Sequence, residues 1–416
     1  QAGGFLEGGP VALNEWTHGC EGILRAAEQS LPPKSRKPNK PWNTPCTLAL
    51  VDQSRNARAA SDWPLEKTLR KQIRKAAMRD RADWLKGLAT RGDWAALREL
   101  RKGCKKQQER LYDTSGEQVS SEQRADTFAE HLASVQWRVQ PVSLIPGSDP
   151  AVNAPLAVKD DEFTADELLK AIGCLSSGKA TKKDDVPAEA LKALALEGGA
   201  AFGWILSFCN LCWTSKSIPR EWATASVAML YKKGDPGVCD NYRPICLLSI
   251  ADKVFASMLK KRLLDAGVED VLWPSQFGFR RGCSTEDAIF IARRRIELAR
   301  AQRNGRASLL ALDWKKAFDS INIESLLDAL RRSGLPQSFL LMIDGMLRDR
   351  QYSVEDFGVV SEARNQLSGI SQGCTLSPLL FIVAMSVLLR DAVDILNEAA
   401  SSIVPGEGKN FPPLGF

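Results

Sequence analysis

The chain has 416 residues, of which 44% are hydrophobic and 25% are charged, and its formal net charge is +6. This length allows two or three domains with a sizeable core, and the apolar content is that of a globular protein. The longest apolar stretch, around Pro378 to Leu389, is interrupted by Ser386 and is too short to span a bilayer, so we expect no transmembrane segment and no membrane partner.

The ten cysteines are scattered singly apart from Cys209 and Cys212, and no secretory signal is visible. We therefore expect an intracellular protein, in the nucleus or the cytoplasm, without disulfides. The first residue is Gln rather than Met, which favours a fragment of a longer protein. Cys209 and Cys212 match half of a zinc site, but their surroundings, WILSFCNLCW, favour an apolar helix.

Residues 1–64 are rich in Pro, Gly, Asn and Ser, which predicts a poorly ordered leader. Residues 65–160 follow as a basic helical extension and linker, with a break predicted at Gly92 and Asp93. Between Glu66 and Arg110 there are fifteen Lys and Arg against six Asp and Glu, a local +9 that leaves −3 for the remainder. This density suggests phosphate contacts with nucleic acid, and the alternative is a solvated face of an ordinary helical layer. The expected nucleic-acid contacts are Lys71, Arg74, Lys75, Lys105 and Lys106.

Further along, three positions are each placed to cap a helix: Thr164, Ser284 or Thr285, and Asn322. A strand is predicted from Leu309 to Asp313, another strand or hairpin from Tyr352, and a last helix from Ser377, with Pro in its first turn. Helices outnumber strands, so the predicted fold class is helix-rich α+β.

The segment LLALDWKKAFDSI, from Leu309 to Ile321, combines an apolar run with an abrupt acid at Asp313. Such a pattern predicts a buried strand that delivers one carboxylate to its exposed end, where it would meet Mg²⁺ beside a phosphate-binding surface. The alternative is a core strand with a polar end.

Four blocks occur in order: YKKGDPGVCDNYRPICLLS from Tyr231, QFGFRRGCSTEDAI from Gln276, LALDWKKAFDS around Asp313, and GISQGCTLSPLLF from Gly369. In order and spacing they resemble the reverse transcriptases of non-LTR, LINE-like retrotransposons. The resemblance implies an incomplete right-hand polymerase fold, fingers and partial palm, over residues 161–416. It also implies an RNA template, a DNA primer and deoxynucleoside triphosphates as partners.

By this resemblance Asp313 is the first catalytic, metal-binding aspartate, and the backbone carbonyl of Trp314 is a further ligand. Phe318 occupies the position of the steric gate that excludes a 2′-hydroxyl, although an aromatic at such a turn is also typical of a core. Asp319, past the turn, is expected to make local hydrogen bonds rather than bind metal.

The remaining blocks supply the nucleotide and template contacts that the resemblance implies. Lys232 and Arg243 would grip the triphosphate, with Lys233 as an alternative to Lys232. Gln372 and Gly373 would lie against the nucleotide and template. Two further contacts, to the template backbone, are assigned to Arg280 and Arg281. Asp287, which also matches a family position, is expected to cap a helix.

The family's aromatic-x-Asp-Asp motif is not found in this sequence. The resemblance therefore implies an RNA-directed DNA polymerase by descent, working by a two-metal mechanism but inactive as this chain. The alternative is a catalytically silent nucleic-acid-binding protein derived from such an enzyme. Mg²⁺ or Mn²⁺ is expected only if the acidic motif is supplied.

Overall fold

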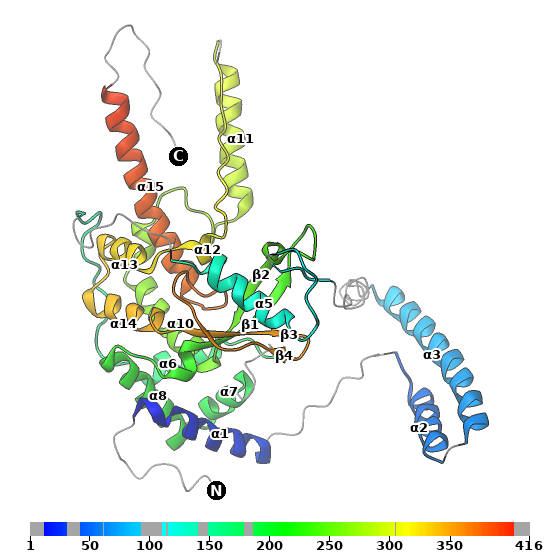
Figure 1. The fold of residues 1–416 in the computed structure, drawn as a ribbon. Coiled ribbons are helices and arrows are strands. Elements are labelled where there is room, and N and C mark those ends of the chain that lie inside the picture. Colours follow the sequence, from blue (N-terminus) through cyan, green and yellow to red (C-terminus); the bar gives the residue numbers. More distant parts are fainter. Residues whose placement is uncertain are drawn as a thin grey trace. The chain divides into compact units, whose positions relative to one another are not determined.

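A computed structural model describes residues 12–30, 42–60, 62–92, 110–113, 115–139, 149–178, 186–303 and 305–402. These residues divide into two compact units, one formed by Ser30–Glu109 and the other by Gln1–Gln29 together with Arg110–Phe416. The residues between 110 and 160 that were expected in a linker are thus grouped with the rest of the larger unit. Figure 1 labels the elements.

The smaller unit is a helical hairpin of α2 (Pro45–Ala59) and α3 (Trp63–Arg91). Asp62 caps α3 by accepting from the Leu65 amide at 3.1 Å, and the helix ends at Gly92, which has a φ of 66°. Asp80 of α3 accepts from the amide of Thr44 at 2.9 Å and from the hydroxyl of Thr47 at 2.7 Å. α3 ends at the predicted position, Gly92, whereas Asp93 and the second helix expected after it lie outside the described residues.

Five strands form the sheet of the larger unit: β1 (Thr224–Tyr231), β2 (Tyr242–Leu247), β3 (Gln351–Asp356), β4 (Val359–Val360) and β5 (Arg364–Asn365). The order is β2-β1-β3-β4, and β5 also pairs with β3. The β1–β2 pair is an antiparallel hairpin, whereas β1 and β3 are parallel. The strand predicted from Tyr352 is thus confirmed.

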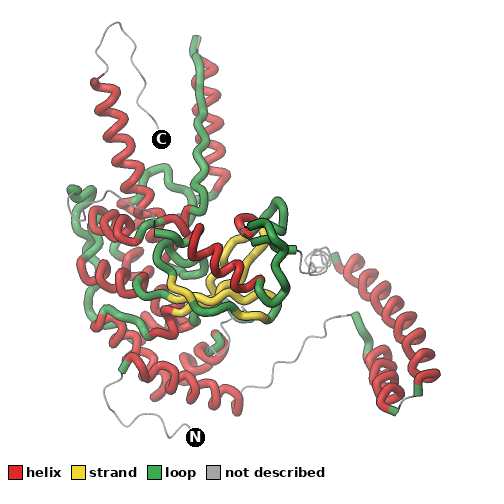
Figure 2. Tube along the Cα trace, in the orientation of Figure 1, coloured by secondary structure: helices red, strands yellow, loops and turns green. Residues whose placement is uncertain are grey.

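One face of this sheet is covered by α5 (Arg124–His131) and the π-helical turn η2 (Leu132–Gln136), as Figure 2 shows for the strands and the helix over them. Alternate strand residues Val227, Cys246 and Val354 are buried there against Phe128 and Leu132. The Tyr352 hydroxyl donates to the Ala129 carbonyl at 2.9 Å, which fixes the helix on the sheet. The opposite face of the β1–β2 hairpin is more open, since Leu230 and its partner Arg243 are exposed.

The main core lies among helices. Their bounds are α1 (Trp16–Ser30), α6 (Ala165–Gly173), α7 (Ala188–Glu197), α8 (Gly199–Ser215), α9 (Arg220–Ala223), α10 (Ile250–Asp265), α11 (Thr285–Ala301), α12 (Ala317–Ser320), α13 (Ile323–Arg332), α14 (Gln337–Leu347) and α15 (Ser377–Ser402). Short 3₁₀ turns are η1 (Leu13–Glu15), η3 (Cys239–Asn241) and η4 (Val268–Val271). The predicted caps are confirmed at Thr164, Ser284 and Asn322. Asp287 accepts from the Ser284 amide at 2.7 Å, as expected for a cap.

The leader expected over residues 1–64 contains helices instead. Trp16 of α1 is buried and stacks on Trp204 at 5.4 Å, with Phe208 and Trp222 also in contact. Four aromatic rings bury a large apolar area, which offsets the entropy lost when this segment is ordered. Pro and Gly content did not reveal this helix because its tryptophan anchor is a long-range contact.

The apolar helix predicted around Cys209 and Cys212 is confirmed as α8, and both thiols are buried. Burial raises the pKa of Cys209 to about 12, as is typical of a cysteine packed in an apolar core. Within the described ranges, no single helix combines the length and apolarity needed to cross a membrane. Among the described helices, α7 and α8 taken together have sufficient length and apolarity, but they meet at a bend of 114°.

The prediction of a buried strand from Leu309 to Asp313 is wrong. Residues 305–314 have no regular structure, and Leu309, Leu310 and Leu312 are 75–80% exposed. A strand needs a neighbour to pair with, and no described strand of the sheet lies alongside this segment. The apolar pattern here is therefore not matched by a facing surface in the described part of the chain.

Candidate functional site

The candidate site is built around the turn that follows Asp313. Asp313 is exposed, at the end of the unpaired segment, and Trp314 is 55% exposed. The chain then turns through Lys316, whose φ of 54° is unusual for a residue with a side chain, and enters α12. The Asp313 carboxylate is thus open to solvent rather than sealed in a core.

An ion pair joins this turn to the β1–β2 hairpin. Lys316 Nζ lies 2.7 Å from Asp240 Oδ1, and Asp240 is in η3, directly before β2. A hydrogen bond from Lys316, and its charge, hold the pKa of Asp240 below its ordinary value against partial burial. Since Asp240 precedes Arg243 by three residues, the hairpin end is held close to the turn after Asp313.

Lys232 and Arg243 lie at this end of the hairpin, and both are exposed. The Lys232 amide donates to the Asn241 carbonyl at 2.8 Å, and Arg243 pairs in register with Leu230. Because strand side chains alternate, Lys232 and Arg243 share the face opposite α5. Two cations on one open face are suited to a phosphate group. Lys233 is exposed as well.

Phe318 connects the turn to two other predicted blocks. Its ring stacks on Phe381 of α15 at 4.8 Å and meets the edge of Phe279 at 5.8 Å. Phe279 immediately precedes Arg280 and Arg281, so the contact brings the predicted template residues next to the candidate gate. Arg281 is exposed and Arg280 is half-buried. Phe318 itself is half-buried, so both its core and its gate interpretations stay compatible with its position.

The loop that carries Gln372 is anchored from several sides. The amides of Gly369 and Ile370 donate to the carbonyls of Ile321 and Phe318, both at 2.8 Å, and the Cys246 amide donates to the Gln372 carbonyl at 2.9 Å. A Cβ at Gly373, whose φ is 143°, would lie 2.3 Å from the Cys246 carbonyl oxygen. Glycine is thus needed here for close approach to β2.

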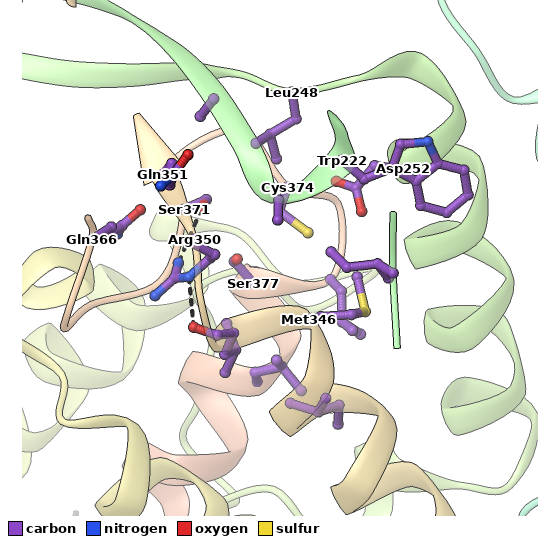
Figure 3. A pocket seen from close by; sticks show the side chains of 17 residues that line it. Trp222, Leu248, Asp252, Met346, Arg350, Gln351, Gln366, Ser371, Cys374 and Ser377 are labelled. Atoms are coloured by element: carbon purple, nitrogen blue, oxygen red, sulfur yellow. Dashed lines mark hydrogen bonds between the residues drawn. The ribbon is translucent and has the colours of Figure 1, made fainter. Parts of the chain in front are cut away.

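Arg350 contacts the same loop and is one of the residues that line a small cavity of about 40 Å³. Figure 3 shows the side chains around it. The Arg350 guanidinium donates to the Gly369 carbonyl at 2.7 Å, the Ser371 hydroxyl at 3.2 Å and the Leu347 carbonyl at 2.8 Å. Burial lowers the pKa of Arg350 to about 10. The arginine therefore shapes the backbone before Gln372 and is not available to a ligand.

Asp319 links Gln372 to Trp137, the residue directly after η2. One carboxylate oxygen accepts from Trp137 Nε1 at 3.0 Å, and the other accepts from Gln372 Nε2 at 2.8 Å. Asp319 is only 2% exposed, and burial raises its pKa while both donors oppose the rise. Asp319 does make hydrogen bonds, but the expectation that they would be local is wrong, because its partners lie 182 and 53 residues away in the sequence.

The metal-binding expectation is not met by the described residues alone. Among them no group of three or more His, Cys, Asp and Glu side chains could hold a metal ion. Mg²⁺ takes several oxygen ligands, and Asp313 with the Trp314 carbonyl supplies an incomplete set. Asp391 of α15 is engaged elsewhere, in two hydrogen bonds from Arg332 at 2.7 and 2.8 Å.

The predicted basic contacts fall in the other unit. Lys71, Arg74 and Lys75 are exposed on α3, while Lys105 and Lys106 lie outside the described residues. Sequence reasoning missed three residues that hold the site: Asp240, Trp137 and Arg350. Of these three, Asp240 lies within the first of the four sequence blocks, so the sequence could have drawn attention to it; Trp137 and Arg350 lie outside the blocks.

Comparison with known proteins identifies the domain that contains these residues. Residues 231–398 match the model of the reverse transcriptase (RNA-dependent DNA polymerase) family. The chain is 26% identical over 270 residues to a probable RNA-directed DNA polymerase from transposon BS of Drosophila melanogaster, covering 64% of this chain and 29% of that protein. The corresponding protein of the X-element of the same fly is 27% identical over 303 residues, covering 70% and 32%.

A third relative is the Pol polyprotein of the type-1 retrotransposable element R2 of Popillia japonica, 32% identical over 174 residues, covering 41% of this chain and 24% of that protein. The chain thus spans less than a third of the length of these relatives. Residues 231–398 include the four blocks with Lys232, Arg243, Arg280, Asp313 and Gln372. Residues 231–398 therefore match a reverse transcriptase domain, and the chain is similar to the proteins of non-LTR retrotransposons.

Proposed function

We propose that this chain forms the nucleotide- and template-holding part of an RNA-directed DNA polymerase, with fingers and a partial palm. The observation that carries the proposal is the Lys316–Asp240 ion pair at 2.7 Å. It joins the turn after Asp313 to the hairpin of Lys232 and Arg243. A metal-bound triphosphate requires a carboxylate and cations near one another, and the ion pair supports such a grouping of Asp313 with Lys232 and Arg243.

In this proposal the partners are an RNA template, a DNA primer and deoxynucleoside triphosphates. Lys232 and Arg243 neutralise the triphosphate, while Arg280 and Arg281 contact the template backbone. Phe318, held by Phe381, forms the wall beneath the sugar, and Gln372 with Gly373 lies against the nucleotide. The exposed side chains of Lys71, Arg74 and Lys75 give α3 a face suited to RNA phosphates.

Nucleotidyl transfer by two metals needs more carboxylates than Asp313. Mg²⁺ or Mn²⁺ would supply charge neutralisation and activation of the primer hydroxyl once further acids complete the ligand set. We infer that this chain by itself binds substrates without extending a primer. In this proposal the isolated chain differs from an active polymerase and behaves as a catalytically silent nucleic-acid binder.

The experiment is a binding titration combined with a primer-extension assay. The chain, with an RNA template annealed to a DNA primer, is titrated with a deoxynucleoside triphosphate and Mg²⁺. We expect saturable binding that weakens by about tenfold in Arg243→Ala, because one charge-assisted phosphate contact is lost.

Arg220→Ala is the matched control, because Arg220 is exposed and lies before the other end of β1. Equal binding by both variants would contradict the assignment of Arg243. In the extension assay, robust DNA synthesis by the unmodified chain would contradict the inferred inactivity.

A further inference from the structure

The Asp319 carboxylate is a buried acceptor placed between two donors. The Trp137 indole nitrogen can only donate, and an ionised carboxylate can only accept. Both oxygens of Asp319 are occupied, one by Trp137 at 3.0 Å and the other by Gln372 Nε2 at 2.8 Å. Gln372 must therefore turn its amino group inward and its carbonyl oxygen the other way.

The outward oxygen is accessible. Gln372 is half-buried, and Oε1 is not among the buried polar atoms that lack a partner. Within the described ranges, the one hydrogen bond of the Gln372 side chain is the one to Asp319. Gln372 Oε1 thus reaches solvent at the edge of the site, where it can accept a hydrogen bond from a ligand.

The surrounding contacts hold this arrangement rigid. Trp137 is 2% exposed and packs edge-on against Tyr352 at 4.5 Å, so its indole cannot turn away. The Gln372 backbone is fixed by Cys246, and the loop is fixed by Arg350. Only the side-chain amide of Gln372 is left with two possible orientations, and Asp319 selects one of them.

We propose that Asp319 is a positioning residue that sets the orientation of the Gln372 amide, so that the site offers a hydrogen-bond acceptor to a donor group of the bound nucleotide or template. The ligand group is then a hydroxyl or an amine rather than a phosphate oxygen. The part of this proposal that concerns the ligand rests on the proposed function. The orientation itself does not.

Asp319→Asn provides the test because it keeps the shape of the side chain. Trp137 still requires an acceptor, so the introduced amide turns its oxygen to Trp137 and its amino group to Gln372. Gln372 must then flip and expose its own amino group. In the double variant Trp137→Phe/Asp319→Asn the indole donor is gone, and the introduced amide can turn its oxygen back to Gln372.

The readout is the hydrogen-exchange rate of the Gln372 side-chain amide, measured by NMR on the full chain with side-chain ¹⁵N-labelled glutamine. A Gln372→Glu sample assigns the signal. We expect exchange about tenfold faster in Asp319→Asn, because the amino group leaves its buried acceptor. The double variant returns the rate to near that of the unmodified chain, and Trp137→Phe alone leaves it unchanged.

An unchanged rate in Asp319→Asn, or a double variant that exchanges faster than either single variant, would overturn the positioning role. The second result is what a purely structural contribution of both residues would give. Trp137→Phe keeps the Asp319–Gln372 hydrogen bond. If the Gln372 amide exchanges faster in this variant too, loss of folding rather than a change of orientation is the cause.

Nucleotide binding by the same variants separates the two proposals. With a deoxynucleoside triphosphate and the template–primer duplex as probe, we expect Kd to rise several-fold in Asp319→Asn and to recover in the double variant. If the unmodified chain binds no nucleotide, the proposed function is contradicted. The proposal on the orientation of the Gln372 amide is then tested by the hydrogen-exchange rates alone. If it binds and Kd is the same in Asp319→Asn, the acceptor role of Gln372 Oε1 is overturned.

Discussion

Lys316 Nζ lies 2.7 Å from Asp240 Oδ1, and this contact spans 76 residues of sequence to connect the turn after Asp313 with the hairpin of Arg243. The lysine side chain is 15% exposed and the aspartate side chain 41%. A pair that is largely withdrawn from water on one side is screened less than a surface pair.

We expect a double-mutant cycle of Lys316→Ala and Asp240→Ala to give a coupling free energy of about 1 kcal/mol in urea unfolding. Each single variant should also weaken nucleotide binding, because the hairpin is no longer tied to the turn. The i,i+4 pair of Lys170 and Asp166 on α6 is the control, since both side chains are 68% exposed. Coupling no larger than in that pair would contradict the structural importance of Lys316.

Replacement of Gly373 by alanine should destabilise the Gln372 loop. The added Cβ would lie 2.3 Å from the Cys246 carbonyl oxygen, and backbone atoms yield less readily than a flexible side chain. We expect a loss of about 2 kcal/mol in the free energy of unfolding. Gly173→Ala is the control, because no atom lies within 4 Å of its added Cβ and helix α6 includes this residue. Equal stability of the two variants would refute the close-approach argument.

Phe318→Ala should relax discrimination against a 2′-hydroxyl. Removal of the ring opens the space that the stack on Phe381 now fills, so a ribonucleotide loses its steric penalty. We expect the ratio of Kd values for ribo- and deoxynucleoside triphosphates to fall by about tenfold. Phe279→Ala removes only the exposed edge contact and should leave the ratio intact. The same change in both variants would indicate a packing effect rather than a gate.

The basic face of α3 should govern RNA affinity through phosphate contacts. Substitution of Lys71, Arg74 and Lys75 by alanine should reduce the steepness of log affinity against log salt concentration by about 2. The reason is that a protein with three fewer phosphate contacts releases fewer counterions when it binds RNA. Lys170→Ala on α6 is the control for loss of a surface charge. An unchanged slope in the triple variant would leave α3 as an ordinary solvated helix.

Acid should weaken the larger unit through Glu167. Partial burial works to raise the pKa of Glu167, but hydrogen bonds from Arg262 and the Thr164 amide lower it to about 2, from an ordinary 4.5. Arg262 donates to Glu167 at 2.7 and 3.0 Å and to the carbonyls of Asp161 and Glu162. Since the folded-state pKa is depressed, this stabilisation is present above about pH 4.5 and is lost as the pH falls toward 2.

We therefore expect Glu167→Gln to be less stable than the unmodified chain by about 2 kcal/mol at pH 6, with the gap narrowing at pH 3. Urea unfolding at both pH values measures it. The exposed Glu162 gives the control variant Glu162→Gln. A gap that stays constant between the two pH values would show that the carboxylate charge is not its cause.

Local features of the fold were predictable from the sequence. The caps at Thr164, Ser284 and Asn322 each depend on residues within three positions, so the pattern contains the whole interaction. The order of the four blocks likewise identified the domain.

Features that depend on distant partners were not predictable. The segment before Asp313 has a strand's pattern, but no described strand pairs with it. Trp16 lies in a segment with a leader's composition and is ordered by Trp204. Trp137 reaches Asp319 across 182 residues. In each case the deciding contact is absent from the local sequence.

The most direct test of the nucleotide site is photo-crosslinking of the chain with an azido-labelled deoxynucleoside triphosphate, in the presence of template–primer and Mg²⁺, followed by peptide mapping. The account predicts that the cross-linked peptides contain Arg243, the turn after Asp313 or Gln372, and that excess unlabelled nucleotide prevents the reaction. Competed cross-links confined to other peptides would contradict it.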